Sequence, residues 1–196
     1  LYRAREDWDD LVHVFKLKLE HAGDDDEKID LLREIAEVQE RSLDTGDDAV
    51  LTWRKVLEVS PQNLYAISNL ERLYPQIEDW TGLLEVLEIK RGMFGSPRDR
   101  VDVDFQMGAV LFEHLSSPER ALEHLRMVLA QQPEHDGTID YLEQMLDDPD
   151  VRMAATLVLE PIYEQRQDYP RQASLIDVQL ADAGDDDERA ELPKRL

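Results

Sequence analysis

LYRAREDWDDLVHVFKLK at residues 1–18 and LYPQIEDWTGLLEVLEIK at residues 73–90 are two versions of one sequence. At the offset of 72 residues that separates them, the alignment continues without a gap as far as Leu70 and Leu142. About twenty aligned positions are identical, where roughly four or five would be expected by chance, and most are apolar or turn positions. The chain therefore contains an internal repeat.

A third version begins with IYEQRQDYPRQASLID at residues 162–177, at an offset of 89 residues from the second. The intervening stretch, LDDPDVRMAATLVLEP at residues 146–161, resembles a duplicated helix, because Ala155 and Leu159 align with Ala66 and Leu70. We expect a single domain over residues 1–196, with units at approximately 1–72, 73–161 (one extra helix) and 162–196 (partial). Both ends interrupt the repeat, so we expect the domain to be an excerpt of a longer array.

Apolar residues within each unit recur at the spacing of an amphipathic helix, as Leu31, Ile35 and Val38 do, and strand-like alternation is absent. Short connections between such segments favour antiparallel neighbours, and stacked hairpins bury a continuous core. The sequence predicts an all-α solenoid of antiparallel helical hairpins. The predicted helices are residues 8–22, 26–44, 47–59, 62–75, 80–93, 98–116, 119–131, 135–147, 150–167 and 170–183.

Charge restricts the partners that the chain can bind. It has 45 acidic and 22 basic side chains, a formal net charge of -23, and this charge repels phosphate backbones and anionic membrane surfaces. We expect no nucleic-acid or membrane partner, and a basic or mixed-charge protein fits better. Cysteine is absent, which leaves the compartment open, with the cytoplasm only as a default. Oligomeric state is not readable.

No residue pattern indicates catalysis. The five histidines lack HExxH spacing, and no phosphate-binding glycine loop or nucleophile elbow occurs. The acidic cluster AGDDDE at residues 22–27 returns at residues 183–188, but its consecutive aspartates lack the alternating ligand spacing of a calcium loop. The middle repeat has FGSPRD at residues 94–99 in its place, which predicts a helix boundary rather than a cation site. We expect no enzyme activity, no cofactor and no bound metal.

Two stretches follow the pattern of a known family. GDDAVLTWRKVLEVSPQN at residues 46–63 and SPERALEHLRMVLAQQPEH at residues 117–135 resemble the second helix and exit proline of tetratricopeptide repeats (TPRs). The residues that carry the resemblance are Ala49, Trp53, Val56 and Pro61, with Ala121, Leu125, Val128 and Pro133 in the later copy. The first helix of each repeat departs from the TPR pattern. The chain also resembles half-a-TPR repeats, which we rank second.

The resemblance implies a right-handed superhelix that acts as a non-catalytic scaffold and binds a partner protein or peptide on its concave helical surface. The alternative is a regulatory or positioning module of a larger enzyme, or a half-a-TPR-type assembly factor. Helical spacing groups several polar and aromatic residues into one candidate partner-binding stripe, and aromatics and arginine contribute strongly to many interfaces. These residues are Tyr65, Asn69, Arg72, Tyr141 and Gln144.

Some members of the family hold the C-terminus of a partner in a carboxylate clamp of Lys, Arg and Asn side chains. We do not expect this clamp here, because the predicted groove has Val38 and Val110 beside acidic residues at these positions. Trp8, Trp53 and Trp80 recur at structural positions, and we assign them to the core. His114 and His124 flank one predicted hairpin turn, where they could meet.

Overall fold

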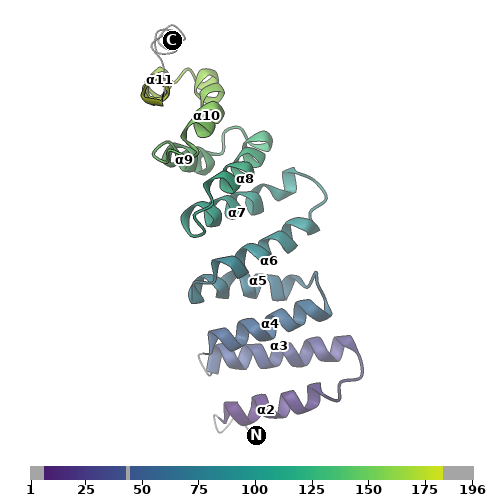
Figure 1. The fold of residues 1–196 in the computed structure, drawn as a ribbon. Helices are drawn as coiled ribbons and strands as arrows, with labels where there is room; N and C mark the ends of the chain where they lie inside the picture. Colours follow the sequence, from purple (N-terminus) through teal and green to yellow (C-terminus); the bar gives the residue numbers. More distant parts are fainter. Residues whose placement is uncertain (1–6, 43–44, 183–196) are drawn as a thin grey trace. The chain divides into compact units, whose positions relative to one another are not determined.

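The computed structural model describes residues 7–42 and 45–182. Within these residues it contains ten α-helices, two short 3-10 helices and no β-strand (Figure 1). The predicted all-α fold is therefore confirmed. The opening residues of the first repeat and the second AGDDDE cluster lie outside the described residues.

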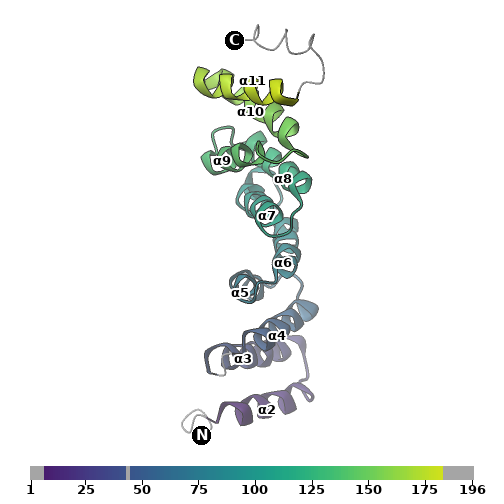
Figure 2. The same ribbon diagram turned by 60° about the vertical axis from the view of Figure 1, so that its left-hand side comes forward.

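The chain divides into two compact units, of which the first ends at Met93. In this unit each helix packs along the next one in the chain, and short loops connect them (Figures 1 and 2). The helices are α2 (Trp8–Leu19), α3 (Asp25–Ser42), α4 (Gly46–Val59), α5 (Leu64–Leu73), η1 (Tyr74–Ile77) and α6 (Trp80–Met93).

The core of the first unit lies between the facing stripes of these helices. Ala49, Trp53 and Val56 of α4 are buried together with Ala66 and Leu70 of α5, and none is more than 1% exposed. Small residues let the helix axes approach, and the large indole fills the remaining space. The TPR-like positions of the sequence are thus packing positions.

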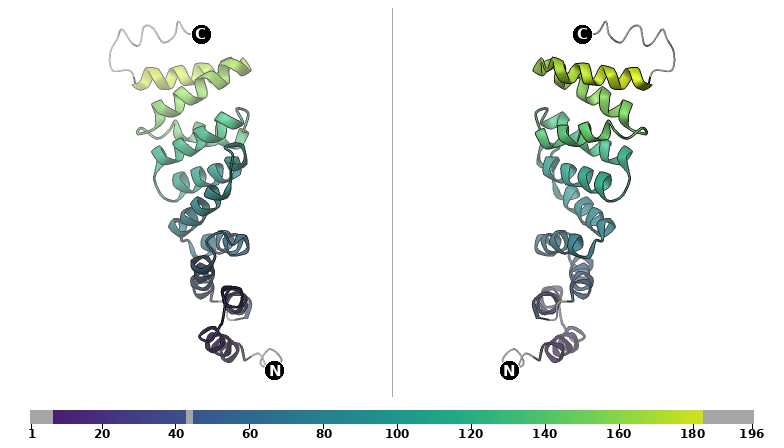
Figure 3. Two further views of the ribbon diagram at one scale, coloured as in Figure 1. Left: turned by 90° about the vertical axis from the view of Figure 1, so that its right-hand side faces the viewer. Right: turned by 90° about the vertical axis from the view of Figure 1, so that its left-hand side faces the viewer.

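The second unit starts at Phe94. Its helices also pack in chain order, and α11 lies along α10 (yellow-green, Figure 3). They are η2 (Arg98–Arg100), α7 (Val101–Glu113), α8 (Pro118–Gln131), α9 (Asp136–Met145), α10 (Arg152–Arg166) and α11 (Tyr169–Asp182). The additional helix expected from residues 146–161 is present as α10.

Helices α7 and α8 approach closely at Gly108. A Cβ atom at this position would lie 2.8 Å from Cδ2 of Leu125, closer than atoms normally pack. Gly108 corresponds to Ala36, so both hairpins place a small residue at the crossing point. This closeness buries Leu125 and Ala121 completely.

One predicted helix begins differently. The segment predicted at 98–116 starts as the 3-10 turn η2, and regular α-helix begins only at Val101. The Arg100 guanidinium donates to the carbonyl oxygen of Phe94 at 2.8 and 3.2 Å, and the N–H of Asp99 donates to Oγ of Ser96. These local hydrogen bonds compete with the regular helical pattern.

The three tryptophans differ in burial. Trp53 is 1% exposed, as expected for a core residue. Trp8 and Trp80 are only partly buried, because each begins a helix and is covered on one side. Trp8 packs against a small cluster that includes Leu11 and Ile35. The assignment to the core is therefore correct for Trp53 and too strong for the other two.

The sequence repeats and the compact units have different boundaries. The repeats begin after residues 72 and 161, inside α5 and α10, whereas packing divides the chain between Met93 and Phe94. A repeat is defined by residue identity and a compact unit by contacts, so the two descriptions are compatible. The division into three repeats stays a prediction.

Candidate functional site

Helix α5 presents two distinct faces. Its apolar face, with Ala66, Ile67 and Leu70, is buried in the first unit. Tyr65 on the other face is 50% exposed, and Arg72 is exposed as well. The Asn63 side chain fixes the start of the helix by accepting a hydrogen bond from the N–H of Ala66 at 3.0 Å.

The predicted residues of α5 form one hydrogen-bonded network with α3. The Tyr65 hydroxyl donates to Oε1 of Glu37 at 3.0 Å, and the Arg72 guanidinium donates to Oε2 of Glu40 at 2.6 Å. Asn69 joins the two, because its Oδ1 accepts from Arg72 at 3.1 Å and its Nδ2 donates to the Tyr65 carbonyl at 2.9 Å. We call these five residues the α3–α5 network. The structure brings Tyr65, Asn69 and Arg72 together.

The Tyr65 ring also packs against the core. It packs edge-on against the buried Trp53, with ring centroids 5.4 Å apart and an interplanar angle of 76°. The ring base is thereby fixed to the core, and its hydroxyl is fixed to Glu37 at the surface. A half-exposed aromatic side chain held at both ends offers contact area to a partner at low entropic cost.

The second unit contains the other two predicted residues, both on α9. The Tyr141 hydroxyl donates to Oε1 of Glu113 on α7 at 2.6 Å. Its ring packs edge-on against Phe105 and Phe112, with centroids 5.6 and 6.3 Å away. Burial, together with the hydrogen bond to Glu113, raises the pKa of Tyr141 from 10 to about 12. Gln144 is exposed.

The tyrosine–glutamate link recurs with a shift of one helical turn. Tyr65 and Glu37 are 28 residues apart, as are Tyr141 and Glu113. In the repeat, however, Tyr141 aligns with Asn69 and not with Tyr65. Alignment of the repeat alone therefore could not find Glu37 as a partner. A search for Tyr and Glu at a constant separation would have found both pairs.

Two positions considered for the groove belong to the core. Val38 and Val110 are 5% and 8% exposed, because the apolar stripes of α3 and α7 face their hairpin partners. Glu37 and Glu40 of α3 instead bond side chains of α5, and Glu113 of α7 bonds Tyr141 of α9.

Buried polar pairs inside the hairpins were not identified from the sequence. Thr52 of α4 donates to Oε1 of Gln39 on α3 at 2.7 Å. At the corresponding position of α8, His124 bonds through Nδ1 to Oδ1 of Asp104 on α7 at 2.9 Å. His124 thus meets a carboxylate and not His114, which lies beside Glu113.

The first acidic cluster forms a helix boundary, as predicted. Asp24 accepts from the N–H of Glu27 at 2.8 Å, and Glu27 accepts from the N–H of Gly23 at 2.9 Å. The Asp24 carboxylate thus caps the start of α3, and the Glu27 carboxylate reaches back to the N–H of the residue before the cap. In the part of the chain that the structure describes, no three histidine or carboxylate side chains gather into a group that could hold a metal ion. None of the described helices is both long and apolar enough to cross a membrane.

No protein-family model and no curated protein sequence matches the chain. Two crystal structures of MamA are similar, each with 14% identity over 87% of this chain, covering 95% and 88% of the MamA chains with TM-scores of 0.50 and 0.51. A crystal structure of YrrB, described as a TPR protein with an unusual peptide-binding site, is 15% identical over 93% of this chain and 98% of its own, with a TM-score of 0.41. The chain has a TPR-like, all-α solenoid fold.

Proposed function

We propose that the chain is a non-catalytic scaffold that binds a partner protein or peptide on the concave helical surface that the TPR resemblance implies. The α3–α5 network is the observation that carries this proposal. It fixes Tyr65 and Arg72 in half-exposed positions through hydrogen bonds of 3.0 and 2.6 Å. Side chains that are ordered before binding lose less conformational entropy in a complex.

Charge supports a basic partner. The carboxylates of Glu37 and Glu40 lie within the network, and the whole chain has a net charge of -23. Lysine or arginine side chains of a partner would form ion pairs with these carboxylates. The exposed ring of Tyr65 offers a surface against which a cation or an aliphatic stem can pack. Rim charges of this kind raise association rates and make binding sensitive to salt.

An immobilised array of short peptides, half of them rich in lysine and arginine and half rich in glutamate, tests this proposal. We expect the chain to bind basic peptides that also contain an aromatic or aliphatic residue, with weaker binding at 0.5 M salt. Binding confined to acidic peptides, or no binding to either half of the array, would contradict the proposal.

Calorimetric titration of the bound peptides against variants locates the surface. We expect Tyr65→Ala/Arg72→Ala to lower the affinity by about tenfold, since two interface side chains are removed. The matched control, Tyr169→Ala/Arg98→Ala, removes the same side-chain types from other exposed positions and should leave the affinity unchanged. Equal effects of the two double variants would remove the α3–α5 network from consideration.

A further inference from the structure

Within the described residues, three tyrosine hydroxyls donate to a glutamate on another helix. The pairs are Tyr65 with Glu37, Tyr141 with Glu113, and Tyr163 with Glu143. A protonated phenol satisfies one lone pair of the carboxylate but leaves its negative charge in place. Each pair therefore combines an aromatic ring with a charge that a cation can balance.

The Tyr163–Glu143 pair is completed by an arginine of the same chain. The Tyr163 hydroxyl donates to Oε1 of Glu143 at 2.5 Å, and Nε of Arg171 pairs with the same oxygen at 3.2 Å. The guanidinium carbon of Arg171 lies 5.7 Å from the centroid of the Tyr163 ring, within the range of a cation–π contact. One guanidinium thus contacts both members of the pair.

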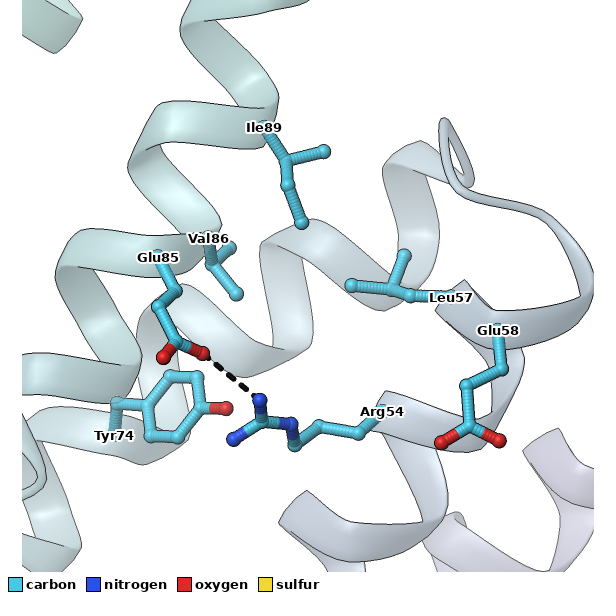
Figure 4. Close-up of a pocket in the computed structure, with 7 residues that line it drawn as sticks. All are labelled: Arg54, Leu57, Glu58, Tyr74, Glu85, Val86 and Ile89. Carbon is cyan, nitrogen blue, oxygen red and sulfur yellow. Dashed lines mark hydrogen bonds and ion pairs between the residues drawn. The ribbon is translucent and has the colours of Figure 1, made fainter.

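Arginines of the first unit also lie beside its glutamates. Nη1 of Arg41 is 4.0 Å from Oε2 of Glu37, the acceptor in the first pair. On α4 and α6, Arg54 pairs with Glu85 at 2.8 Å, and its guanidinium lies next to the Tyr74 hydroxyl (Figure 4). The combination of tyrosine, glutamate and arginine therefore recurs in this fold.

Glu113 has no such arginine within the described residues. Its partners there are the Tyr141 hydroxyl, 2.6 Å from Oε1, and His114, whose Nε2 lies 3.6 Å from Oε2 and is cationic only when protonated. In the repeat, Arg41 aligns with Glu113 itself, so the second unit has a carboxylate where the first has a cation. The Glu113 side chain is 47% exposed, which leaves it accessible to a cation from outside the chain.

The carboxylate adjoins an aromatic surface. The Tyr141 ring packs edge-on against Phe105 and Phe112, and all three rings are partly exposed. We call these three residues and Glu113 the α7–α9 cluster. Because the pKa of Tyr141 is raised to about 12, its phenol stays protonated at neutral pH, and the Tyr141–Glu113 pair carries one negative charge. The cluster thus offers a carboxylate and aromatic rings to the same ligand group.

We propose that the α7–α9 cluster binds an arginine side chain of the partner, with the guanidinium paired to Glu113 and packed against the aromatic rings. Arg171 makes the same two contacts with Glu143 and Tyr163 inside the chain. Arginine fits better than lysine, because its planar guanidinium donates several hydrogen bonds and stacks on aromatic rings. The inference rests on the proposed binding of a partner, and it adds a binding position in the second unit.

Three capped amino acids, titrated into the isotope-labelled 196-residue chain, test the proposal by nuclear magnetic resonance. We expect N-acetyl-arginine N-methylamide to cause saturable shifts of the Phe105, Phe112 and Tyr141 ring signals. The lysine counterpart should bind roughly threefold more weakly, and the citrulline counterpart, which has a similar shape without the charge, about tenfold more weakly. Equal binding of either counterpart, or saturable shifts confined to other residues, would overturn the proposal.

Variants of the cluster separate the charge from the rings. Glu113→Gln should weaken binding of the arginine probe by about tenfold, because it removes the charge and keeps an oxygen that can accept from Tyr141. The matched control Glu123→Gln removes an exposed carboxylate from α8 and should leave the affinity unchanged. Phe112→Leu should weaken binding by about threefold, since it removes a ring and keeps an apolar side chain. Unchanged affinity of Glu113→Gln or of Phe112→Leu would overturn the proposed contact.

This inference and the proposed function can fail separately. Tyr65→Ala/Arg72→Ala should leave binding of the arginine probe unchanged, because both changes lie in the first unit. A loss of binding in that variant would place the probe on the α3–α5 network and overturn the inference. Basic peptides that bind the α3–α5 network, combined with no binding of the arginine probe to the α7–α9 cluster, would overturn the inference and leave the proposed function intact.

Discussion

His124 Nδ1 lies 2.9 Å from Oδ1 of Asp104, and the two side chains join α8 to α7 inside the second unit. Asp104 is 3% exposed, so its carboxylate depends on protein groups for its hydrogen bonds. In the first unit, Thr52 occupies the position of His124 and bonds Gln39, a neutral side chain. The two hairpins thus use chemically different polar pairs.

Replacement of His124 by alanine should therefore lower the free energy of unfolding by about 1–3 kcal/mol, since it removes a partner of a buried carboxylate. The double variant His124→Leu/Asp104→Leu should recover most of this loss, because it removes both polar groups together. Urea denaturation measures both. A double variant less stable than His124→Ala would contradict this account.

Removal of the hydroxyl should cost stability at Tyr163 and almost none at Tyr74. Tyr163→Phe takes a partner away from Glu143 and should destabilise the chain by about 1–2 kcal/mol. Tyr74→Phe removes a buried hydroxyl that has no partner in the described residues, so its cost should be near zero. Thermal and urea unfolding compare the two variants. Equal losses would show that Tyr74 has a hydrogen bond in solution.

Gly82 and Gly92 lie on the same helix, α6, in different surroundings. A Cβ atom at Gly82 would collide with the Tyr74 ring, whereas one at Gly92 would meet no atom within 4 Å. Gly82→Ala should destabilise the chain by about 1–3 kcal/mol through overpacking. Gly92→Ala should stabilise it by about 0.5 kcal/mol, since alanine is the better helix former. Urea midpoints of the two variants check the sign of each effect.

Tyr141 should make stability depend on pH in alkaline solution. Its pKa is about 12 in the folded chain and 10 ordinarily, so the unfolded chain loses the phenol proton first as pH rises. The resulting stabilisation is complete below pH 10 and declines as pH approaches 12. The stability difference between the unaltered chain and Tyr141→Phe should be smaller at pH 11 than at pH 9. A constant difference would contradict the raised pKa.

Helix positions were readable from the sequence because they depend on local apolar spacing and on caps. The predicted helix at 80–93 is α6, and the acidic residues that follow Gly23 do start α3. The partners of Tyr65 and His124 were not readable, because Glu37 and Asp104 lie on other helices and contact depends on how those helices are rotated. Helical spacing alone predicts the exposed stripe, whereas the contact that holds the Tyr65 ring against Trp53 is visible only in three dimensions.

Similar hairpins within one chain carry a risk during folding, because a helix of one repeat can pair with a helix of another. The polar pairs of the hairpins oppose such exchange. If α7 were to fold against α4, the Asp104 carboxylate would be buried against Thr52, which has one hydroxyl and no cationic form. If α8 were to fold against α3, His124 would face the place where Leu32 stands instead of Asp104. The polar pair buried in the second hairpin therefore favours assembly of each helix with its own neighbour.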